Sequence, residues 1–457
     1  MATIKKKALI IGAGTGGYPC AIRLGQLGVD AMLVEKDKPG GVCLNWGCIP
    51  SKALISATKL YHKAQHVKDM GLSFGQAAVD MTQMQSWKSG IVKKLTGGVQ
   101  GLVKGAGTQY VTATATFLDA HRVKLTYADG KPEDIVEAEH IVVATGSLPI
   151  EIPGFKFDGK RVLDSTAALD LAQVPKRMVC VGGGIIGLEL GQTFQRLGTQ
   201  LIVLEGLPRI LNGVDAECAE VVARQIKKDG GQIHTGAKAL GWEERGGEAV
   251  VKAEVGGKIQ EFACDVILVA VGRRPVTQGF GLDKTGVKVS PRGFIEVDNR
   301  QQTNVPGVYA VGDVVGQPML AHKASHEGEV LAEVIAGRKT INDARQIPNV
   351  VFTEPEIASS GLTVEEAEAK GLKTNIGKFP FAASGRAMAI GETAGFVKIV
   401  TDAKDDRVVG VHIVGPEASD LINEAALAIE MGAFAEDIAL TIHPHPTLGE
   451  AVMEAAK

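Results

Sequence analysis

Long apolar runs, aromatic side chains and an excess of one charge are all scarce in this 457-residue sequence. No stretch approaches the ~20 consecutive apolar residues that cross a bilayer, which argues against a membrane partner. The formal net charge is −3, so the chain has no general attraction to nucleic acid or anionic lipid. Aromatic residues make up only 5%, which disfavours surfaces that stack nucleic-acid bases. We expect neither nucleic acid nor a membrane as a partner.

Cysteine is also scarce, with 6 in the chain, which argues against a disulfide-stapled secreted domain. Three lysines, 5–7, precede a short apolar run that breaks at Gly12. We therefore interpret this start as a first β-strand rather than a signal peptide. The expected location is cytoplasmic, where a disulfide is usually catalytic or transient.

Glycine, by contrast, is abundant, and short Val/Ile/Leu strands alternate with helical segments, a pattern typical of parallel α/β sheets. The length suggests about three domains. One internal repeat stands out: a Gly-x-Gly-x-x-Gly motif, with an acidic residue 23 positions after its first glycine, recurs 170 residues later. The first copy is Gly12, Gly14, Gly17 and Glu35, and the second is Gly182, Gly184, Gly187 and Glu205.

Both copies follow a strand and precede a helix, which is the context that a dinucleotide-binding motif requires. The first glycine permits the sharp turn, and the second lets the backbone approach a pyrophosphate at the helix N-terminus. The third lets helix and strand pack closely, and the acid accepts hydrogen bonds from a ribose. Two copies therefore predict two bound dinucleotides.

Two cysteines, Cys43 and Cys48, follow the first of these units by only a few residues. Two ordinary buried thiols or half of a zinc site are the alternatives. A zinc site built from cysteines needs a second close pair. The remaining cysteines stand singly, at Cys20, Cys180, Cys218 and Cys264. Beside a cofactor's phosphate loop, we interpret the Cys43–Cys48 pair as a redox disulfide, and we expect no metal site.

Further residues that could bind a cofactor or take part in catalysis lie at strand ends and near the C-terminus. Thr145 and Gly146 end a strand where the chain leaves the first unit, and Gly272 and Arg273 do so after the second. Asp313 also lies at a strand end, where cofactor atoms gather in such sheets, although a plain turn aspartate is the alternative.

The last hundred residues change character and suggest a separate α+β unit, with a helix from Asp420 to Met431. His445 stands between two prolines, and Glu450 follows five residues later. A carboxylate on one ring nitrogen fixes the tautomer and supports the other nitrogen as a base. A turn histidine near a helix-starting glutamate is the alternative from this segment alone.

With these segments in order, the sequence resembles the pyridine nucleotide–disulfide oxidoreductases over essentially its whole length. The stretch Gly-Gly-Val-Cys43-Leu-Asn-Trp-Gly-Cys48-Ile-Pro-Ser-Lys52 and the stretch His443-Pro-His445-Pro-Thr-Leu-Gly-Glu450 are its most specific parts. Thr15, Trp46 and Gly449 depart from residues often found at these positions, but none removes a reactive group.

The resemblance implies an α/β fold with two Rossmann-like domains, one for FAD and one for NAD, and a C-terminal α+β dimerisation domain. The implied boundaries are 1–148 for the FAD domain with the redox disulfide, 149–275 for the NAD domain, 276–345 for a return segment and 346–457 for the interface domain. It implies Glu35 on the FAD ribose, Asp313 near the ribityl chain and pyrophosphate, and Glu205 on the NAD ribose.

The resemblance also assigns the remaining residues. Cys48 would lie against the flavin and Cys43 would face the substrate. Lys52 would lie by the reactive edge of the flavin, paired with Glu189, and His445 with Glu450 would be the acid–base pair. The other expected FAD-site residues are Gly12, Gly14, Gly17, Thr145, Gly146 and Ala321. The other expected NAD-site residues are Gly182, Gly184, Gly187, Gly272 and Arg273.

The implied reaction is oxidation of dihydrolipoamide with NAD⁺ through the Cys43–Cys48 disulfide and FAD. The expected partners are a second copy of the chain, lipoyl domains, and the E2-type acyltransferase core of 2-oxo acid dehydrogenase complexes or the glycine cleavage carrier protein. An NADPH-dependent glutathione-type reductase is the nearest alternative, but Glu205 would repel a 2′-phosphate. Mercuric reductase would need an extra cysteine pair at the C-terminus, whereas the last cysteine here is Cys264. A soluble transhydrogenase would lack the disulfide pair. A non-catalytic structural subunit is disfavoured because the reactive residues are retained.

Overall fold

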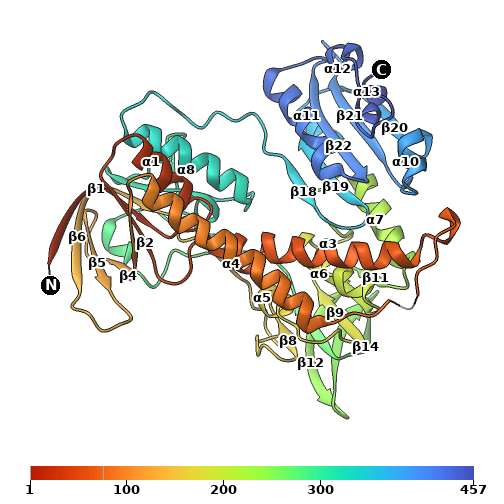
Figure 1. Cartoon of the computed structure of the whole chain (residues 1–457), viewed down its shortest axis with the longest axis horizontal. Coiled ribbons are helices and arrows are strands. Elements are labelled where there is room, and N and C mark those ends of the chain that lie inside the picture. The colour runs from red at the N-terminus through yellow and green to blue at the C-terminus, as the bar shows by residue number, and fades with distance from the viewer. Residues whose placement is uncertain (1, 76) are drawn as a thin grey trace. The chain divides into compact units, whose positions relative to one another are not determined.

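The computed structural model describes residues 2–75 and 77–457, which form two compact units (Figure 1). Unit 1 contains the chain up to Ala53, Thr82–Ile150 and Gly272–Asp343. Unit 2 contains Leu54–Met81, Glu151–Val271 and Ala344–Lys457. The mixed α/β class predicted from the alternating pattern is confirmed. The four individual domain boundaries stay predictions.

Unit 1 is built on a sheet with strand order β3-β2-β1-β6-β5-β4, with β17 beside β6. Strands β3, β2, β1, β6 and β17 are parallel neighbours, and β4 and β5 are antiparallel. The strands are β1 (Thr3–Ile11), β2 (Ala31–Glu35), β3 (Gln109–Thr112), β4 (Thr114–Phe117), β5 (Arg122–Thr126), β6 (Asp134–Val143) and β17 (Val308–Ala310). A small antiparallel pair adds β7 (Ser147–Pro149) and β16 (Arg273–Pro275).

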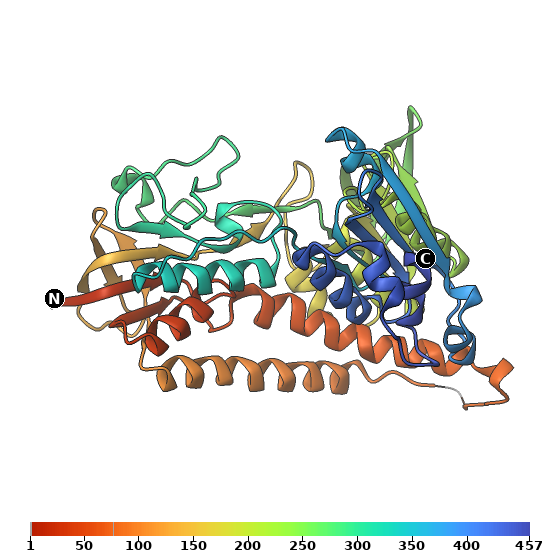
Figure 2. The same cartoon turned by 90° about the horizontal axis from the view of Figure 1, so that it is seen from above.

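Apolar side chains cover both faces of this sheet, as a parallel sheet requires. Successive residues of β1 point to opposite faces, so Ile10 joins one core and Leu9 joins the other. The first core includes Leu24 of α1 and Leu331 of α8. These two helices lie side by side in both views (Figures 1 and 2). The helices of this unit are α1 (Gly17–Gln26), α2 (Gly41–Trp46), α4 (Met81–Gly105) and α8 (Ala321–Ile335), with short 3₁₀ turns η2 (Leu282–Thr285) and η3 (Gly312–Val315).

Helix α3 (Cys48–Gln65) begins in unit 1 and belongs to unit 2 from Leu54 onward. The N-terminal part of unit 2 also includes the 3₁₀ turn η1 (Lys68–Met70). Across residues 2–75 and 77–457, none of the helices combines the length and the apolarity that a bilayer crossing needs.

Unit 2 contains a second parallel sheet, with order β11-β10-β9-β15-β8. Its elements are β8 (Val162–Leu163), α5 (Ser165–Leu169), β9 (Arg177–Val181), α6 (Ile185–Arg196), β10 (Gln200–Glu205), α7 (Ala216–Lys228), β11 (Gln232–Thr235) and β15 (Val266–Val269). An antiparallel sheet of β12 (Lys238–Arg245), β13 (Glu248–Val255) and β14 (Lys258–Cys264) packs on it, and the two share one apolar core that includes Val179 and Val251.

The C-terminal part of unit 2 is an antiparallel sheet, drawn in blue in Figure 1, with order β18-β19-β22-β21-β20. Its strands are β18 (Asn349–Val351), β19 (Glu356–Gly361), β20 (Thr374–Pro380), β21 (Phe396–Asp402) and β22 (Val408–Gly415). Its helices are α9 (Val364–Ala369), α10 (Gly385–Ala389), α11 (Ala418–Met431), α12 (Ala435–Leu440) and α13 (Glu450–Ala456), with the 3₁₀ turn η4 (Phe381–Ala383). The predicted helix 420–431 is thus confirmed as most of α11.

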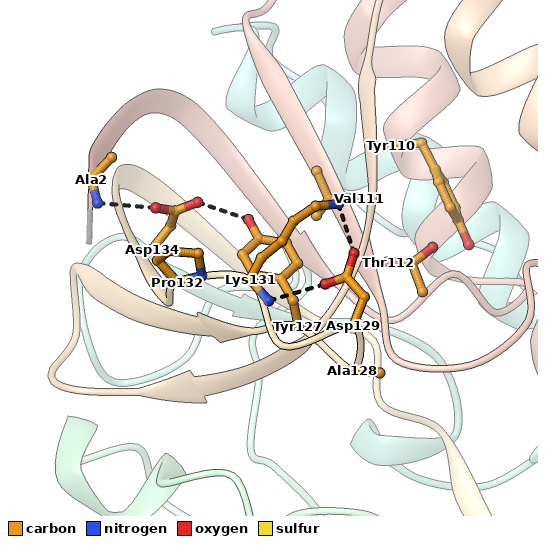
Figure 3. Close-up of a pocket in the computed structure, with 10 residues that line it drawn as sticks. All are labelled: Ala2, Tyr110, Val111, Thr112, Tyr127, Ala128, Asp129, Lys131, Pro132 and Asp134. Carbon is orange, nitrogen blue, oxygen red and sulfur yellow. Dashed lines mark hydrogen bonds and ion pairs between the residues drawn. The ribbon is translucent and has the colours of Figure 1, made fainter.

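A cavity of about 820 Å³ lies in unit 1 beside β3 and the β5–β6 connection (Figure 3). Its charged groups are already paired. Asp129 bonds Lys131 Nζ at 2.7 Å, and Asp134 accepts from the Tyr127 hydroxyl at 3.0 Å (Figure 3). None of the residues predicted for catalysis or cofactor binding lines this cavity, and we do not assign the active site to it.

Candidate active site

The two glycine motifs form turns of nearly the same geometry. Gly12 has φ +105° and Gly182 has φ +108°, a backbone region that favours glycine. A Cβ at Gly12 would lie 2.3 Å from the carbonyl oxygen of Ala144, and a Cβ at Gly182 would lie 2.5 Å from that of Ala270. Each first glycine is therefore needed both for the turn and for the close approach of the neighbouring strand.

The middle glycine of each motif is different, because space is left beside it. No atom lies within 4 Å of a Cβ built at Gly184, and at Gly14 the nearest is at 3.9 Å. A Cβ at the third glycines would collide with the turn itself, at 1.8 Å for Gly17 and 2.3 Å for Gly187. The open position at the start of α1 and α6 fits a pyrophosphate, which needs close backbone approach at a helix N-terminus.

The strand-end acids are held against these turns by main-chain N–H groups. Glu35 accepts from Ala13 N at 2.7 Å and from Asp37 N at 2.9 Å. Glu205 accepts in the same way from Gly183 N at 2.6 Å and from Leu207 N at 2.7 Å. The two copies therefore share their hydrogen bonds as well as their spacing, and both fit a dinucleotide.

The two cysteines predicted to form the redox pair lie on consecutive helices, the first of which begins at Gly41 beside the first glycine turn. Cys43 is on α2 and Cys48 is the first residue of α3. A Cβ at Gly41 would lie 2.6 Å from Gly14 Cα, so the cysteine segment packs directly against the phosphate loop. The Asn45 side chain donates to the carbonyl oxygen of Gly41 at 2.9 Å and braces the segment.

Both cysteines are thiols in the structure, with no bond between the two sulfur atoms. The side-chain hydrogen bond with Cys48 raises the pKa of the Cys43 thiol most, and burial and a Cys48 thiolate charge raise it further. Lys52 acts in the opposite direction and lowers this pKa. Cys43 is thus favoured as the proton-bearing sulfur of the reduced pair. The disulfide of the oxidised protein stays a prediction.

Tyr18 is a neighbour of the cysteines that was not predicted from the sequence. Burial, followed by the charges of Cys43 and Cys48, raises the pKa of its phenol. It lies on the first turn of α1, directly after Gly17, and packs against the same core as Cys43. The only signal in the sequence is its place one residue after the motif.

Two residues at strand ends in unit 1, Asp313 and Arg273, both bond to the side chain of Ser147, which is 3% exposed. The Ser147 hydroxyl donates to Asp313 Oδ2 at 2.5 Å and accepts from Arg273 Nε at 2.8 Å. Thr145, next to Gly146, donates to the carbonyl oxygen of Val276 at 2.6 Å. The resemblance assigns Arg273 to the NAD site. The structure shows that its guanidinium binds Ser147, and its contact with NAD stays a prediction.

Replacing Ser147 with alanine is expected to lower the melting temperature of the protein. The change removes the hydroxyl that donates to Asp313 and accepts from Arg273 Nε, and loss of such buried hydrogen bonds typically costs about 1–3 kcal/mol. Thermal unfolding followed by circular dichroism measures the effect. Ser147→Thr keeps the hydroxyl and is the control. Equal melting temperatures for Ser147→Ala and the parent protein would contradict the structural role given to this bond.

A second supporting network surrounds η3 and α8. The Gly312 N–H donates to Glu327, which is 3% exposed, at 2.8 Å. Lys323 forms an ion pair with the same carboxylate at 2.8 Å. Ala321, predicted at the FAD site, is the first residue of α8. These bonds fix the backbone that carries Asp313, although Glu327 and Lys323 were not singled out from the sequence.

The predicted histidine–glutamate pair is confirmed as a hydrogen bond in unit 2. His445 Nδ1 lies 2.8 Å from Glu450 Oε1, and Glu450 is the first residue of α13. The Thr447 N–H donates to Glu450 at 2.8 Å and, with the imidazole, lowers the pKa of this carboxyl. Nε2 of His445 is left as the outward nitrogen, and the side chain is 80% exposed. A neighbouring pair was missed: His443 Nε2 lies 2.8 Å from Glu424.

Two predicted partners, Lys52 and Glu189, lie in different units, and their pairing stays a prediction. Glu189 is 5% exposed and accepts a hydrogen bond from Phe352 N at 2.9 Å. Glu189 is therefore a buried carboxylate rather than an ordinary surface charge. No group of three or more His, Cys, Asp or Glu side chains in the described residues is placed to hold a metal ion together.

Known families and proteins match this chain along almost its whole length. The family described as pyridine nucleotide-disulphide oxidoreductase matches residues 6–328, and its dimerisation domain matches residues 347–456. A dihydrolipoyl dehydrogenase from Geobacillus stearothermophilus is 48% identical over 454 residues, which cover 99% of this chain and 96% of that protein. One from Bacillus subtilis is 48% identical over 455 residues, with 99% and 96% covered.

A solved structure is similar over the same extent. The crystal structure of LpdA from Mycobacterium tuberculosis has a TM-score of 0.90 and 26% sequence identity, and the match covers 100% of this chain and 99% of that one. The resemblance predicted from the cysteine and histidine segments is confirmed by these matches.

Proposed function

The chain belongs to the pyridine nucleotide-disulphide oxidoreductase family, and on this premise we propose that it oxidises dihydrolipoyl groups with NAD⁺ through Cys43 and Cys48. FAD and NAD are its cofactors, with FAD in unit 1 and NAD at the second glycine motif. The observation that carries the assignment is the cysteine pair packed against the first phosphate loop.

The residues of the chain support thiol–disulfide exchange followed by electron transfer. His445 Nε2 takes a proton from one thiol of the substrate, and the resulting thiolate attacks Cys43 Sγ in the disulfide. The second substrate thiol then displaces Cys43, so that a cyclic disulfide is released and both cysteines are reduced. Bound FAD supplies the two-electron chemistry that passes these electrons to NAD⁺, giving NADH and a proton overall.

The electrostatics of the cysteine site agree with these roles. The hydrogen bond between the two thiol groups raises the pKa of Cys43 and so favours the proton on this sulfur, which assigns the negative charge of the reduced pair to Cys48. Lys52 follows Cys48 by one turn of α3 and acts on this pair as a positive charge. We assign Cys48 to the flavin side and Cys43 to the substrate side.

The active form is a homodimer, and His445 completes the site of the other chain. The C-terminal segment matches a dimerisation domain. Large apolar side chains are exposed in the same C-terminal segment, including Met431 at 76%, Leu440 at 74% and Ile442 at 94%. Such a surface is typical of an interface between subunits. Lipoyl domains, E2-type cores and the glycine cleavage carrier protein remain the proposed partners, in the cytoplasm.

The preference of the chain for NAD⁺ over NADP⁺ is expected to be strong. The Glu205 carboxylate is fixed at the end of β10, where a 2′-phosphate would meet a like charge at a cost of several kcal/mol. This corresponds to about 100-fold or more in kcat/KM, which is measured with each cofactor in turn.

Glu205→Gln is expected to lower the ratio of kcat/KM for NAD⁺ to kcat/KM for NADP⁺. The control is Glu220, an exposed acid on α7, and Glu220→Gln is expected to leave this ratio unchanged. Equal kcat/KM values for NAD⁺ and NADP⁺ in the parent protein would overturn the assignment and favour a glutathione-type reductase.

The proposed activity is tested by an anaerobic titration of the FAD-loaded protein with dihydrolipoamide, followed by addition of NAD⁺. The first step is expected to change the flavin spectrum, and the second to produce NADH. A spectrum that does not respond to the dithiol would contradict the proposal. A colourless purified protein would instead support a non-catalytic structural subunit.

A further inference from the structure

Helix α3 carries a pair of histidines that the proposed reaction does not use. His62 and His66 are four positions apart in the sequence, so their side chains lie on the same face of the helix. Their rings are stacked, with centroids 4.1 Å apart and an angle of 28° between the planes. The helix therefore holds the two imidazoles together without help from a distant part of the chain.

The ring nitrogens of His66 have distinct roles. His66 Nδ1 lies 2.8 Å from the main-chain oxygen of His62, a bond in which the ring nitrogen donates its hydrogen. A histidine bonded in this way has its second nitrogen, Nε2, in the form that accepts a metal. The same bond orients the ring of His66 above the turn that carries His62.

We propose that His62 and His66 form a two-histidine binding site for a divalent late first-row transition metal, with Cu²⁺ bound most tightly. Two imidazoles on successive turns of a helix are a recognised pair of metal ligands. Imidazole suits Zn²⁺, Ni²⁺ and Cu²⁺, and Cu²⁺ gives the strongest complexes of the series. No third ligand completes a group at this position in the described chain, so water fills the remaining positions and the metal is exchangeable.

Other groups could bind the same metal, and the experiment must remove or control for them. Cys43 and Cys48 are soft sulfur ligands and would compete when reduced. The remaining cysteines, Cys20, Cys180, Cys218 and Cys264, are buried. A second pair with the same spacing, His322 and His326, lies on α8.

The test uses the untagged, FAD-loaded protein with Cys43→Ser and Cys48→Ser, titrated with Cu²⁺ by calorimetry. We expect one binding event for each chain. The electron paramagnetic resonance spectrum should show coupling to nitrogen from imidazole. Adding His66→Ala is expected to weaken the event by roughly 100-fold, because the chelate is reduced to a single ligand. His62→Ala should weaken Cu²⁺ binding by the same factor. His121 is exposed and has no second histidine beside it in the sequence, so His121→Ala should leave Cu²⁺ binding unchanged.

Two results would overturn the proposal. The first is an unchanged binding event in His62→Ala and His66→Ala proteins whose circular dichroism spectra and flavin content match the parent. The second is loss of the event in His326→Ala, which would place the metal on α8. Because Cys43 and Cys48 are absent from every protein compared, neither result depends on the proposed redox function.

Discussion

Turnover of the His445→Gln protein is expected to be about 10²–10⁴-fold slower than that of the parent, the usual loss when a general base is removed. Glutamine cannot take the substrate proton, but it remains polar at an 80% exposed position, so flavin content should not change. Glu450→Gln should cost less, because the imidazole remains and only its orientation by the 2.8 Å bond is weakened. Steady-state kcat with dihydrolipoamide and NAD⁺ measures both effects.

His443→Gln is the matched control for this experiment. It also removes an imidazole bonded to a glutamate, but its side chain is only 7% exposed. We expect a smaller loss of kcat. A larger loss for His443→Gln than for His445→Gln would show that the acid–base role had been given to the wrong histidine.

A mixture of two inactive proteins tests whether the site is shared between chains. Cys43→Ser chains and His445→Gln chains, exchanged into mixed dimers, are expected to regain activity, because one of the two sites then has both residues. Absence of recovery, with mixed dimers demonstrated by native mass spectrometry, would mean that each site is built within one chain.

Loss of either redox cysteine is expected to abolish oxidation of dihydrolipoamide, on the order of 10⁴-fold or more, as for other covalent nucleophiles. The two variants should nevertheless differ in colour. Cys43→Ser retains the Cys48 thiolate and is expected to show a long-wavelength band from a thiolate against the flavin. Cys48→Ser should lack this band. Absorbance spectra of the anaerobic proteins distinguish the two.

Cys264→Ala is the control for this pair, because Cys264 is a buried cysteine at the end of β14 in unit 2. It should retain activity and, on reduction, the band of the parent. A band in Cys48→Ser that is absent from Cys43→Ser would reverse the roles of the two sulfurs.

Features set by neighbouring residues could be predicted from the sequence. The glycine turns follow from backbone requirements within six residues, and the second copy repeats them. The bond between His445 and Glu450 joins residues five apart, so prolines and a helix start were enough to anticipate it. The acids at the ends of β2 and β10 were found for the same reason, since the strand and the turn define their position.

Features that depend on distant residues could not be predicted. Ser147 forms hydrogen bonds with Asp313, 166 positions away in the sequence, and with Arg273, 126 positions away, and no local pattern links these residues. The grouping of Leu54–Met81 with unit 2 is of the same kind. Lys59 on α3 lies 3.6 Å from Glu354, a contact that depends on tertiary packing rather than on the helix sequence.

Unit 1 is assembled from separated stretches, and this has a consequence for the order of events during translation. Strand β6 ends at Val143, but its parallel neighbour β17 begins at Val308. At ~5–20 residues per second, roughly ten to thirty seconds separate the emergence of these two strands from the ribosome. Helix α8, whose Leu331 covers α1, emerges later still. The nascent chain therefore exposes an apolar face of its first sheet while unit 2 begins to form, and it cannot complete the proposed FAD site until most of the protein has been made.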